Sequence, residues 1–136
     1  MLKLIPSILS PELLAVLAEM GHGDEIVLAD ANFPAVSTAQ RLVRADGHSV
    51  NTILEAVLKL LPLDTFVESP AVVMQIVDKP NESAPIWTDF QKHLDHAEGR
   101  HVAISSIERF AFYERSKKAF AVVSTGETAL YANLIL

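Results

Sequence analysis

The chain has 136 residues, of which half are apolar and 21% are charged, and this is the composition of one ordinary globular domain. Its 17 acidic side chains outnumber its 11 basic ones and give a formal net charge of −6, so nucleic acid is a poor candidate for a partner. The absence of cysteine excludes disulfides, thiolate nucleophiles and thiolate metal sites.

The sequence carries no pattern of a secretory signal or a membrane span. Its first seven residues contain one lysine and a short apolar stretch that Pro6 ends, which is not the layout of a secretory signal. No segment approaches the roughly 20 apolar residues of a membrane-spanning helix. We therefore expect a cytoplasmic protein without a membrane partner.

The N-terminal part predicts a helix followed by a strand. Ser10 can cap a helix over residues 11–20, where apolar side chains recur at helical spacing until Gly21 ends it. Residues 25–29 form a short apolar run with polar neighbours, which predicts a buried strand with Asp30 at its carboxyl end. A turn over residues 31–34 follows.

The middle of the chain predicts a second helix and a second strand. Apolar residues over 50–61 keep the spacing of an amphipathic helix, and Pro62 stops it. Residues 71–77 read as another buried strand, and the turn-rich segment 78–85 reads as a surface loop.

The C-terminal part predicts one more helix over residues 86–98 and three strands, at 102–107, 119–124 and 130–136. Only a turn at 125–128 separates the last two strands, which favours mixed strand directions. Because helices and strands alternate without an internal repeat, we expect the α/β class, with helices packed around one mixed β-sheet in a single domain spanning residues 1–136.

His22 is the leading candidate for acid/base chemistry. Gly21 and Gly23 flank it, so the backbone can approach a ligand closely and the imidazole is left uncovered. Histidine side chains in general exchange protons near neutral pH. Alternatively, Gly21 is only a helix cap and His22 an ordinary surface residue. A dinucleotide site is not supported, because its glycines follow a strand and precede a helix.

Four further side chains are candidates for binding a hydroxylated ligand. Asp30 lies at the sheet edge that commonly lines a ligand crevice in α/β folds, although an aspartate there can equally start a turn. Asp64 has the same two interpretations. Arg109 and Tyr113 share one face if their segment is helical and could bind a polyol, or they belong to a surface network of ion pairs.

No metal or cofactor is expected. His93, His96 and His101, with Asp89 and Asp95, are residue types that bind metals, but no open-site motif surrounds them. The chain also lacks a Gly-x-Ser-x-Gly elbow and a glycine-rich loop with lysine, so acyl transfer and nucleotide-phosphate chemistry lack their usual groups. Metal-free acid/base chemistry remains.

Six short motifs are spread in order over the whole chain. They are Ser-Pro-Glu-Leu-Leu at 10–14, Met-Gly-His-Gly-Asp-Glu at 20–25, Asp-Ala-Asn-Phe-Pro at 30–34, Arg-Ala-Asp-Gly at 44–47, Arg-Phe-Ala-Phe-Tyr-Glu-Arg at 109–115 and Tyr-Ala-Asn at 131–133. Together they resemble the L-fucose mutarotase and D-ribose pyranase family, which implies an RbsD-like fold. The segments 61–65 and 85–87 look like the animal-type members of the fucose branch.

The resemblance implies a role for each matching residue. The histidine of the family's Gly-His-Gly-Asp motif is its proton donor, which corresponds to His22, and the aspartate that follows binds sugar, which corresponds to Asp30. We expect Asp64, in the animal-type segment, to bind sugar as well. The arginine and tyrosine used by the fucose branch correspond to Arg109, a sugar ligand, and to Tyr113, a second catalytic group; the ribose branch has histidine in place of this arginine. The family's terminal sugar-binding motif corresponds to Tyr131, Ala132 and Asn133.

The activity implied by this resemblance is the interconversion of the α and β anomers of L-fucose by ring opening and closure, with no cofactor. The alternatives are a D-ribose pyranase, which interconverts pyranose and furanose forms, and a non-catalytic monosaccharide-binding module. The resemblance also implies a ring-shaped homo-oligomer, up to a decamer, in which neighbouring subunits complete each sugar site.

Overall fold

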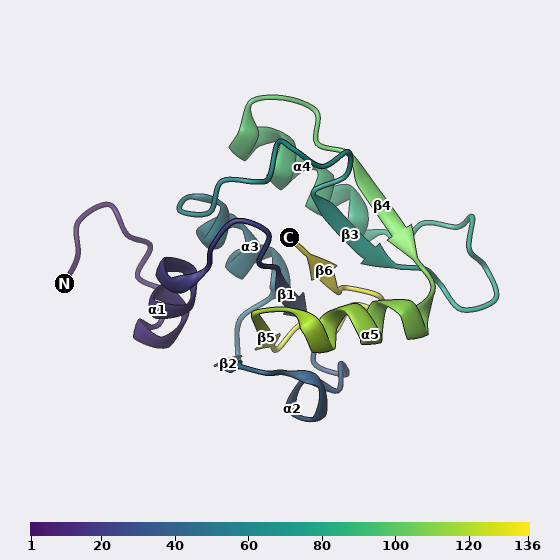
Figure 1. Cartoon of the computed structure of the whole chain (residues 1–136), viewed down its shortest axis with the longest axis horizontal. Helices are drawn as coiled ribbons and strands as arrows, with labels where there is room; N and C mark the ends of the chain where they lie inside the picture. Colours follow the sequence, from purple (N-terminus) through teal and green to yellow (C-terminus); the bar gives the residue numbers. More distant parts are fainter.

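Six short strands form one mixed β-sheet in the computed structural model, which describes residues 1–136 (Figure 1). The strands are β1 (Ile26–Ala29), β2 (Leu42–Ala45), β3 (Ala71–Met74), β4 (Ile104–Ile107), β5 (Ala121–Thr125) and β6 (Leu134–Ile135). Their order across the sheet is β2-β5-β1-β6-β3-β4. β5 is parallel to β1 and β2, and β3 is parallel to β4, whereas β6 runs antiparallel between β1 and β3. The predicted α/β class with a mixed sheet is confirmed.

Five helices cover the two faces of the sheet. They are α1 (Pro11–Glu19), α2 (Ala35–Thr38), α3 (Val50–Leu58), α4 (Ile86–Glu98) and α5 (Arg109–Lys118). Helices α1, α3 and α4 pack over a core of 25 buried residues on one face, and α2 and α5 pack over a core of 10 on the other (Figure 1). Ile26 and Leu28 of β1 face the larger core and Val27 and Ala29 the smaller one, because successive side chains of a strand point to opposite faces.

Local hydrogen bonds explain where the long helices begin and end. The Ser10 hydroxyl accepts a hydrogen bond from Leu13 N at 3.1 Å, and the Ser49 hydroxyl accepts one from Thr52 N at 3.2 Å. These side chains satisfy backbone donors that have no partner within the first turn of α1 and α3. Gly99, with φ of 67°, ends α4 in the left-handed conformation that glycine adopts without strain.

Several elements are shorter than the apolar patterns predict, two were not predicted, and α5 was expected only as one possibility for the segment 109–115. The predicted strand at 71–77 stops at Met74, and the predicted helix at 50–61 stops at Leu58. The sequence pattern did not reveal α2, because it is a single turn, or β2, because it is an edge strand in which only Val43 is buried. Neither therefore shows a hydrophobic period.

The last strand has different neighbours from those that a short connecting turn suggests. After β5 the chain passes over the carboxyl end of β1, where Ala31 N donates to Glu127 O at 2.9 Å. It then enters the sheet on the far side of β1, pairing Ile135 with both Val27 and Val72. β6 is thus antiparallel, as mixed strand directions predict, but it does not pair with β5.

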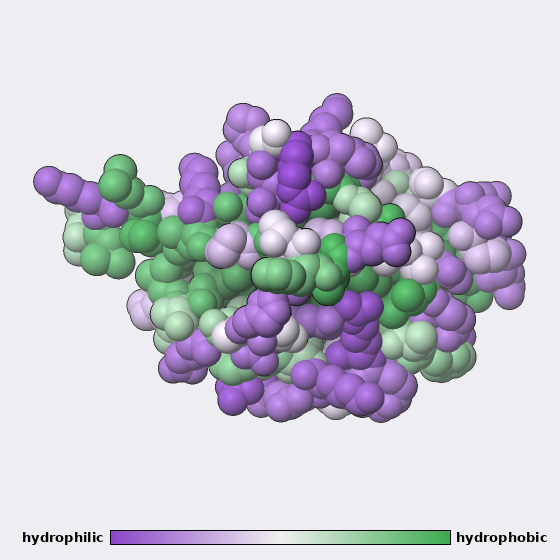
Figure 2. Space-filling view, turned by 45° about the horizontal axis from the view of Figure 1, so that its top comes forward, coloured by the Kyte–Doolittle hydropathy of each residue, from purple (hydrophilic) through white to green (hydrophobic).

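Some large apolar side chains remain exposed on the surface. Figure 2 shows apolar surface on the side of the molecule from which the N-terminal arm projects. The exposed apolar side chains include Met1, Leu2, Leu4, Phe66, Phe110 and Leu130. Apolar surface of this kind is commonly a contact with another molecule. No helix combines the length and the apolar character needed to cross a membrane.

Candidate functional site

A tight turn between α1 and β1 presents His22 to solvent. Asp24 N donates to Gly21 O at 3.1 Å, and Gly21 N donates to the Asp24 carboxylate at 2.8 Å, so the turn is closed from both sides. Gly23 has φ of 89°, a conformation that costs little only for glycine. The backbone around His22 is therefore fixed while its imidazole stays free of any hydrogen bond within the chain.

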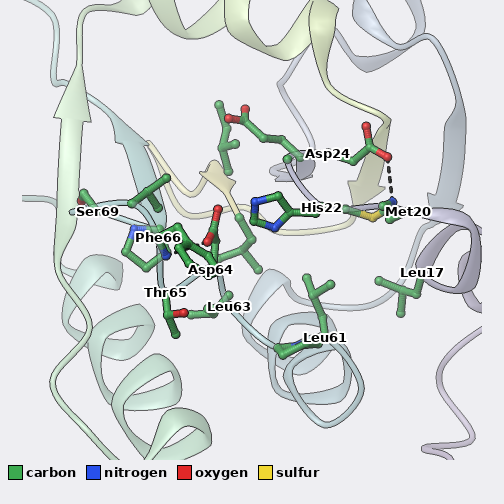
Figure 3. Close-up of a pocket in the computed structure, with 18 of the residues that line it drawn as sticks. Leu17, Met20, His22, Asp24, Leu61, Leu63, Asp64, Thr65, Phe66 and Ser69 are labelled. Atoms are coloured by element: carbon green, nitrogen blue, oxygen red, sulfur yellow. Dashed lines mark hydrogen bonds between the residues drawn. The ribbon is translucent and has the colours of Figure 1, made fainter.

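The His22 imidazole projects into a pocket of about 520 Å³ (Figure 3). Asp64 points toward it from the loop between α3 and β3, and its carboxylate also accepts a hydrogen bond from Phe66 N at 2.8 Å. The Phe66 ring meets the His22 ring edge-on, with the centroids 5.6 Å apart and the planes at 89°. Asp64 thus starts a turn and faces the pocket at once. Phe66 was not singled out from the sequence, where its only signal is an aromatic residue between the predicted helix at 50–61 and the predicted strand at 71–77.

An ion pair anchors α5 beside this pocket. The Arg115 guanidinium donates to both oxygens of the Glu25 carboxylate at distances of 2.7 to 3.1 Å. The hydrogen bonds from Glu25 raise the pKa of Arg115 above its usual value. Arg115 lies beside this pocket, and Arg109, the first residue of α5, follows the carboxyl end of β4, so α5 runs between the two ends of the parallel strands.

Asp30 lies buried at the carboxyl end of β1, with only 5% of its surface exposed. Its backbone N donates to the Asn133 side-chain oxygen at 2.9 Å, and the Asn133 amide returns a hydrogen bond to the Asp30 carboxylate at 3.1 Å. Asn32 N donates to the other carboxylate oxygen at 3.0 Å. Burial raises the pKa of Asp30 despite these hydrogen bonds, so its carboxylate is a stronger proton acceptor than that of an exposed aspartate.

Tyr131 and Ala132 lie beside this pair. Tyr131 has φ of 56°, a strained conformation for a residue with a side chain. Its carbonyl accepts a hydrogen bond from the Trp87 indole at 2.9 Å, and its hydroxyl accepts one from Val77 N at 3.2 Å. Ala132 is fully buried. These contacts hold the strained backbone in place next to Asn133.

Arg109 and Tyr113 both lie on α5, so the segment 109–115 is helical. The Arg109 guanidinium stands over the Phe110 ring, 4.6 Å from its centroid, and its buried Nε has no hydrogen-bond partner. A buried donor without a partner is costly unless a ligand satisfies it. The Tyr113 ring lies 5.6 Å from Phe33, three residues beyond Asp30.

The histidines of α4 do not gather into a metal site, and no three potential ligands lie close enough together to hold an ion. His101 approaches the Asp95 carboxylate at 3.4 Å. The hydrogen bond from Val102 N, at 2.8 Å, is the main cause that lowers the pKa of Asp95.

Known proteins resemble this chain along almost its whole length. The model of the RbsD / FucU transport protein family matches residues 3–136. The chain belongs to the RbsD / FucU family. The human fucose mutarotase is 61% identical, over 99% of this chain and 91% of that protein. The solved structure of the Streptococcus pneumoniae fucose mutarotase in complex with L-fucose has a TM-score of 0.93 and 47% identity, over 99% of this chain and 96% of that one. The Bacillus subtilis RbsD complexed with D-ribose shares the fold, with a TM-score of 0.70 at 24% identity over 94% of this chain and 91% of that one.

In this RbsD / FucU chain the candidate site residues fall into two groups. His22 and Asp64 line the pocket that precedes β1. The group beyond the carboxyl end of β1 consists of Asp30, Arg109, Tyr113, Tyr131, Ala132 and Asn133. At about 3.3 Å per residue, the four residues of β1 alone separate the two groups by about 10 Å. Within one copy of the chain these two groups of candidate residues therefore do not meet.

Proposed function

We propose that the whole chain, residues 1–136, acts as one L-fucose mutarotase domain. It is then an isomerase that interconverts the α and β anomers of the sugar by opening and closing the ring. The relatives named fucose mutarotase support the reaction, and the L-fucose complex of the Streptococcus pneumoniae protein supports the ligand. The polar cluster around Asp30, with an unpaired donor on Arg109, is the kind of surface that binds sugar hydroxyls.

The separation of the two residue groups, which we take to be half-sites of one shared site, is the observation on which this proposal mainly rests. A proton donor must lie within hydrogen-bond distance of the atom that it protonates, and His22 cannot reach a sugar held at Asp30 of the same chain. We infer that His22 of one copy meets the Asp30 half-site of a neighbouring copy, in a homo-oligomer that is a ring of up to ten subunits. The exposed apolar residues supply surface for such contacts.

The chemistry needs only proton transfer. Ring opening removes a proton from the anomeric hydroxyl and places one on the ring oxygen, and closure reverses both steps after the carbonyl has rotated. His22 donates to the ring oxygen and recovers the proton, and Tyr113 serves as the second group in proton transfer. Asp30, Asp64 and Arg109 bind sugar hydroxyls, together with the terminal segment Tyr131, Ala132 and Asn133.

A modest lowering of the barrier is sufficient for this reaction, because anomers already interconvert slowly in water. Each tenfold gain in rate needs about 1.4 kcal/mol, which orientation and a single acid/base group can supply. A cytoplasmic location belongs to the same proposal.

NMR saturation transfer between the two anomeric protons of L-fucose tests the proposal directly. We expect the wild-type chain to accelerate exchange, His22→Ala to lose the acceleration, and His96→Ala, an exposed histidine on α4, to keep it. Acceleration of D-ribose exchange alone would assign the chain to the pyranase reaction. Saturable binding without acceleration would make it a sugar-binding module.

A further inference from the structure

Glu127, in the loop between β5 and β6, has a half-buried carboxylate that accepts three backbone hydrogen bonds. Val50 N donates to one oxygen at 3.3 Å, and Thr128 N and Ala129 N donate to the other at 3.0 and 3.2 Å. Val50 is the first residue of α3, where backbone donors lack partners within the helix. One side chain thus joins the loop to a helix on the larger core.

The main chain of Glu127 holds the end of β1 from the same position. Its carbonyl accepts a hydrogen bond from Ala31 N at 2.9 Å. Its N–H donates to the Thr125 hydroxyl at 3.2 Å, and this hydroxyl donates to Ala29 O at 2.7 Å. Both chain neighbours of Asp30 are therefore tied to one loop.

The same loop leads directly into the other residues of this half-site. Four residues after Glu127 comes the strained Tyr131, and two residues later Asn133 exchanges hydrogen bonds with Asp30. The proposed chemistry gives the Glu127 side chain no contact with the sugar. Its side-chain contacts hold the loop against the start of α3, and the main chain of the same residue ties that loop to the neighbours of Asp30.

We propose that Glu127 is a positioning residue for sugar binding, which it serves by holding Asp30 and the segment 131–133 in register. This inference rests on the proposed function. The residues that Glu127 orders, Asp30 and the segment 131–133, bind the sugar in the ground state and in the transition state, whereas His22 of a neighbouring copy and Tyr113 on α5 transfer the protons. Loss of the Glu127 contacts should therefore raise KM and leave kcat nearly unchanged.

Two variants and one control test this split. Glu127→Gln keeps the size and one acceptor oxygen but places an amide against backbone donors, and Glu127→Ala removes every contact of the carboxylate. Glu55→Gln, an exposed residue of α3 that makes no hydrogen bond through its side chain, is the control. For L-fucose we expect KM to rise about tenfold in Glu127→Gln, equivalent to about 1.4 kcal/mol, and further in Glu127→Ala. The pH profile of kcat should match that of the wild type.

Wild-type KM in both variants would overturn the inference, and so would a lower melting temperature with an unchanged KM. If Glu127→Ala does not assemble, Glu127→Gln decides. If even the wild-type protein fails to accelerate exchange, the proposed function is wrong. Calorimetric titration with L-fucose then still tests the role of Glu127. Weaker binding of L-fucose by Glu127→Gln than by the wild type supports its positioning role, and equal binding refutes it.

Discussion

Mixing two inactive variants should restore activity if each sugar site combines residues from two copies. His22→Ala removes an exposed side chain with no hydrogen bond, and Arg109→Ala removes a guanidinium whose Nε has no partner, so both variants should fold. Neither variant alone can form a complete site. In a mixed oligomer, an intact His22 from one chain can meet an intact Arg109 from its neighbour.

The expected recovery follows from the arrangement of the half-sites. About 10 Å of β1 separates them within a chain, whereas a proton donor acts at about 3 Å. In an equal mixture with random assembly, about one site in four has both residues intact, so the exchange rate should recover to about a quarter of the wild-type value. If both residues acted within one chain, mixing would restore nothing.

A second mixture makes the measurement stricter. A double variant, His22→Ala with Arg109→Ala, mixed equally with wild-type chains should also leave about a quarter of the sites intact when sites are shared, but about half when each chain holds its own. Saturation transfer on L-fucose measures the rate, and native mass spectrometry verifies that mixed oligomers have formed. No recovery in proven mixed oligomers of the single variants would refute the shared site.

Three further predictions follow from individual contacts. Phe66→Leu should lower kcat about two- to tenfold with little change in KM, because the edge-on ring contact that orients His22 is of a type worth about 0.5–1.5 kcal/mol. Phe66→Tyr keeps the ring and should keep the wild-type rate. A wild-type rate in Phe66→Leu would contradict this role. Because burial raises the pKa of Asp30, the native state holds the Asp30 proton to a higher pH than the unfolded chain does. The stability that Asp30 contributes is therefore complete below its ordinary pKa of 3.8. It is lost as the pH rises through the pKa of Asp30 in the folded state. Urea unfolding across this acidic range should show that loss in the wild type and not in Asp30→Asn, and parallel pH curves would disprove it. Arg115→Lys should lower the free energy of unfolding by about 0.5–1 kcal/mol, because an ammonium group does not pair with both oxygens of Glu25 as a guanidinium does. The effect is small because solvent partly screens the ion pair. High salt should reduce the difference in melting temperature between the wild type and Arg115→Lys.

Local signals in the sequence predicted the elements whose stability is decided within a few residues. The helix expected at 86–98 is α4 with the same bounds, and Ser10 caps α1 as its position before Pro11 suggests. Helix caps and glycine turns act over a single turn of chain, so their residues lie together in the sequence. The exposure of His22 between two glycines belongs to the same class of signal.

The boundaries of the strands and the identity of their neighbours were not available from such signals. An apolar run records that a segment is buried but not which strand lies beside it, and pairing fixed β3 and β6 at fewer residues than their apolar runs contain. The insertion of β6 between β1 and β3 depends on the path of the loop over Asp30, which no local pattern describes.

The sequence by itself determined the class of fold, the family and the residue types that the proposed chemistry needs. The tertiary structure decided how these residues group: Asp30 joins Asn133 across 103 positions, and Glu25 joins Arg115 across 90, while His22 and Asp30, only eight positions apart, lie at opposite ends of β1. The physical reason is that an extended strand carries the chain about 3.3 Å per residue and separates near neighbours, whereas pairing of strands and packing of helices bring distant residues into hydrogen-bond contact.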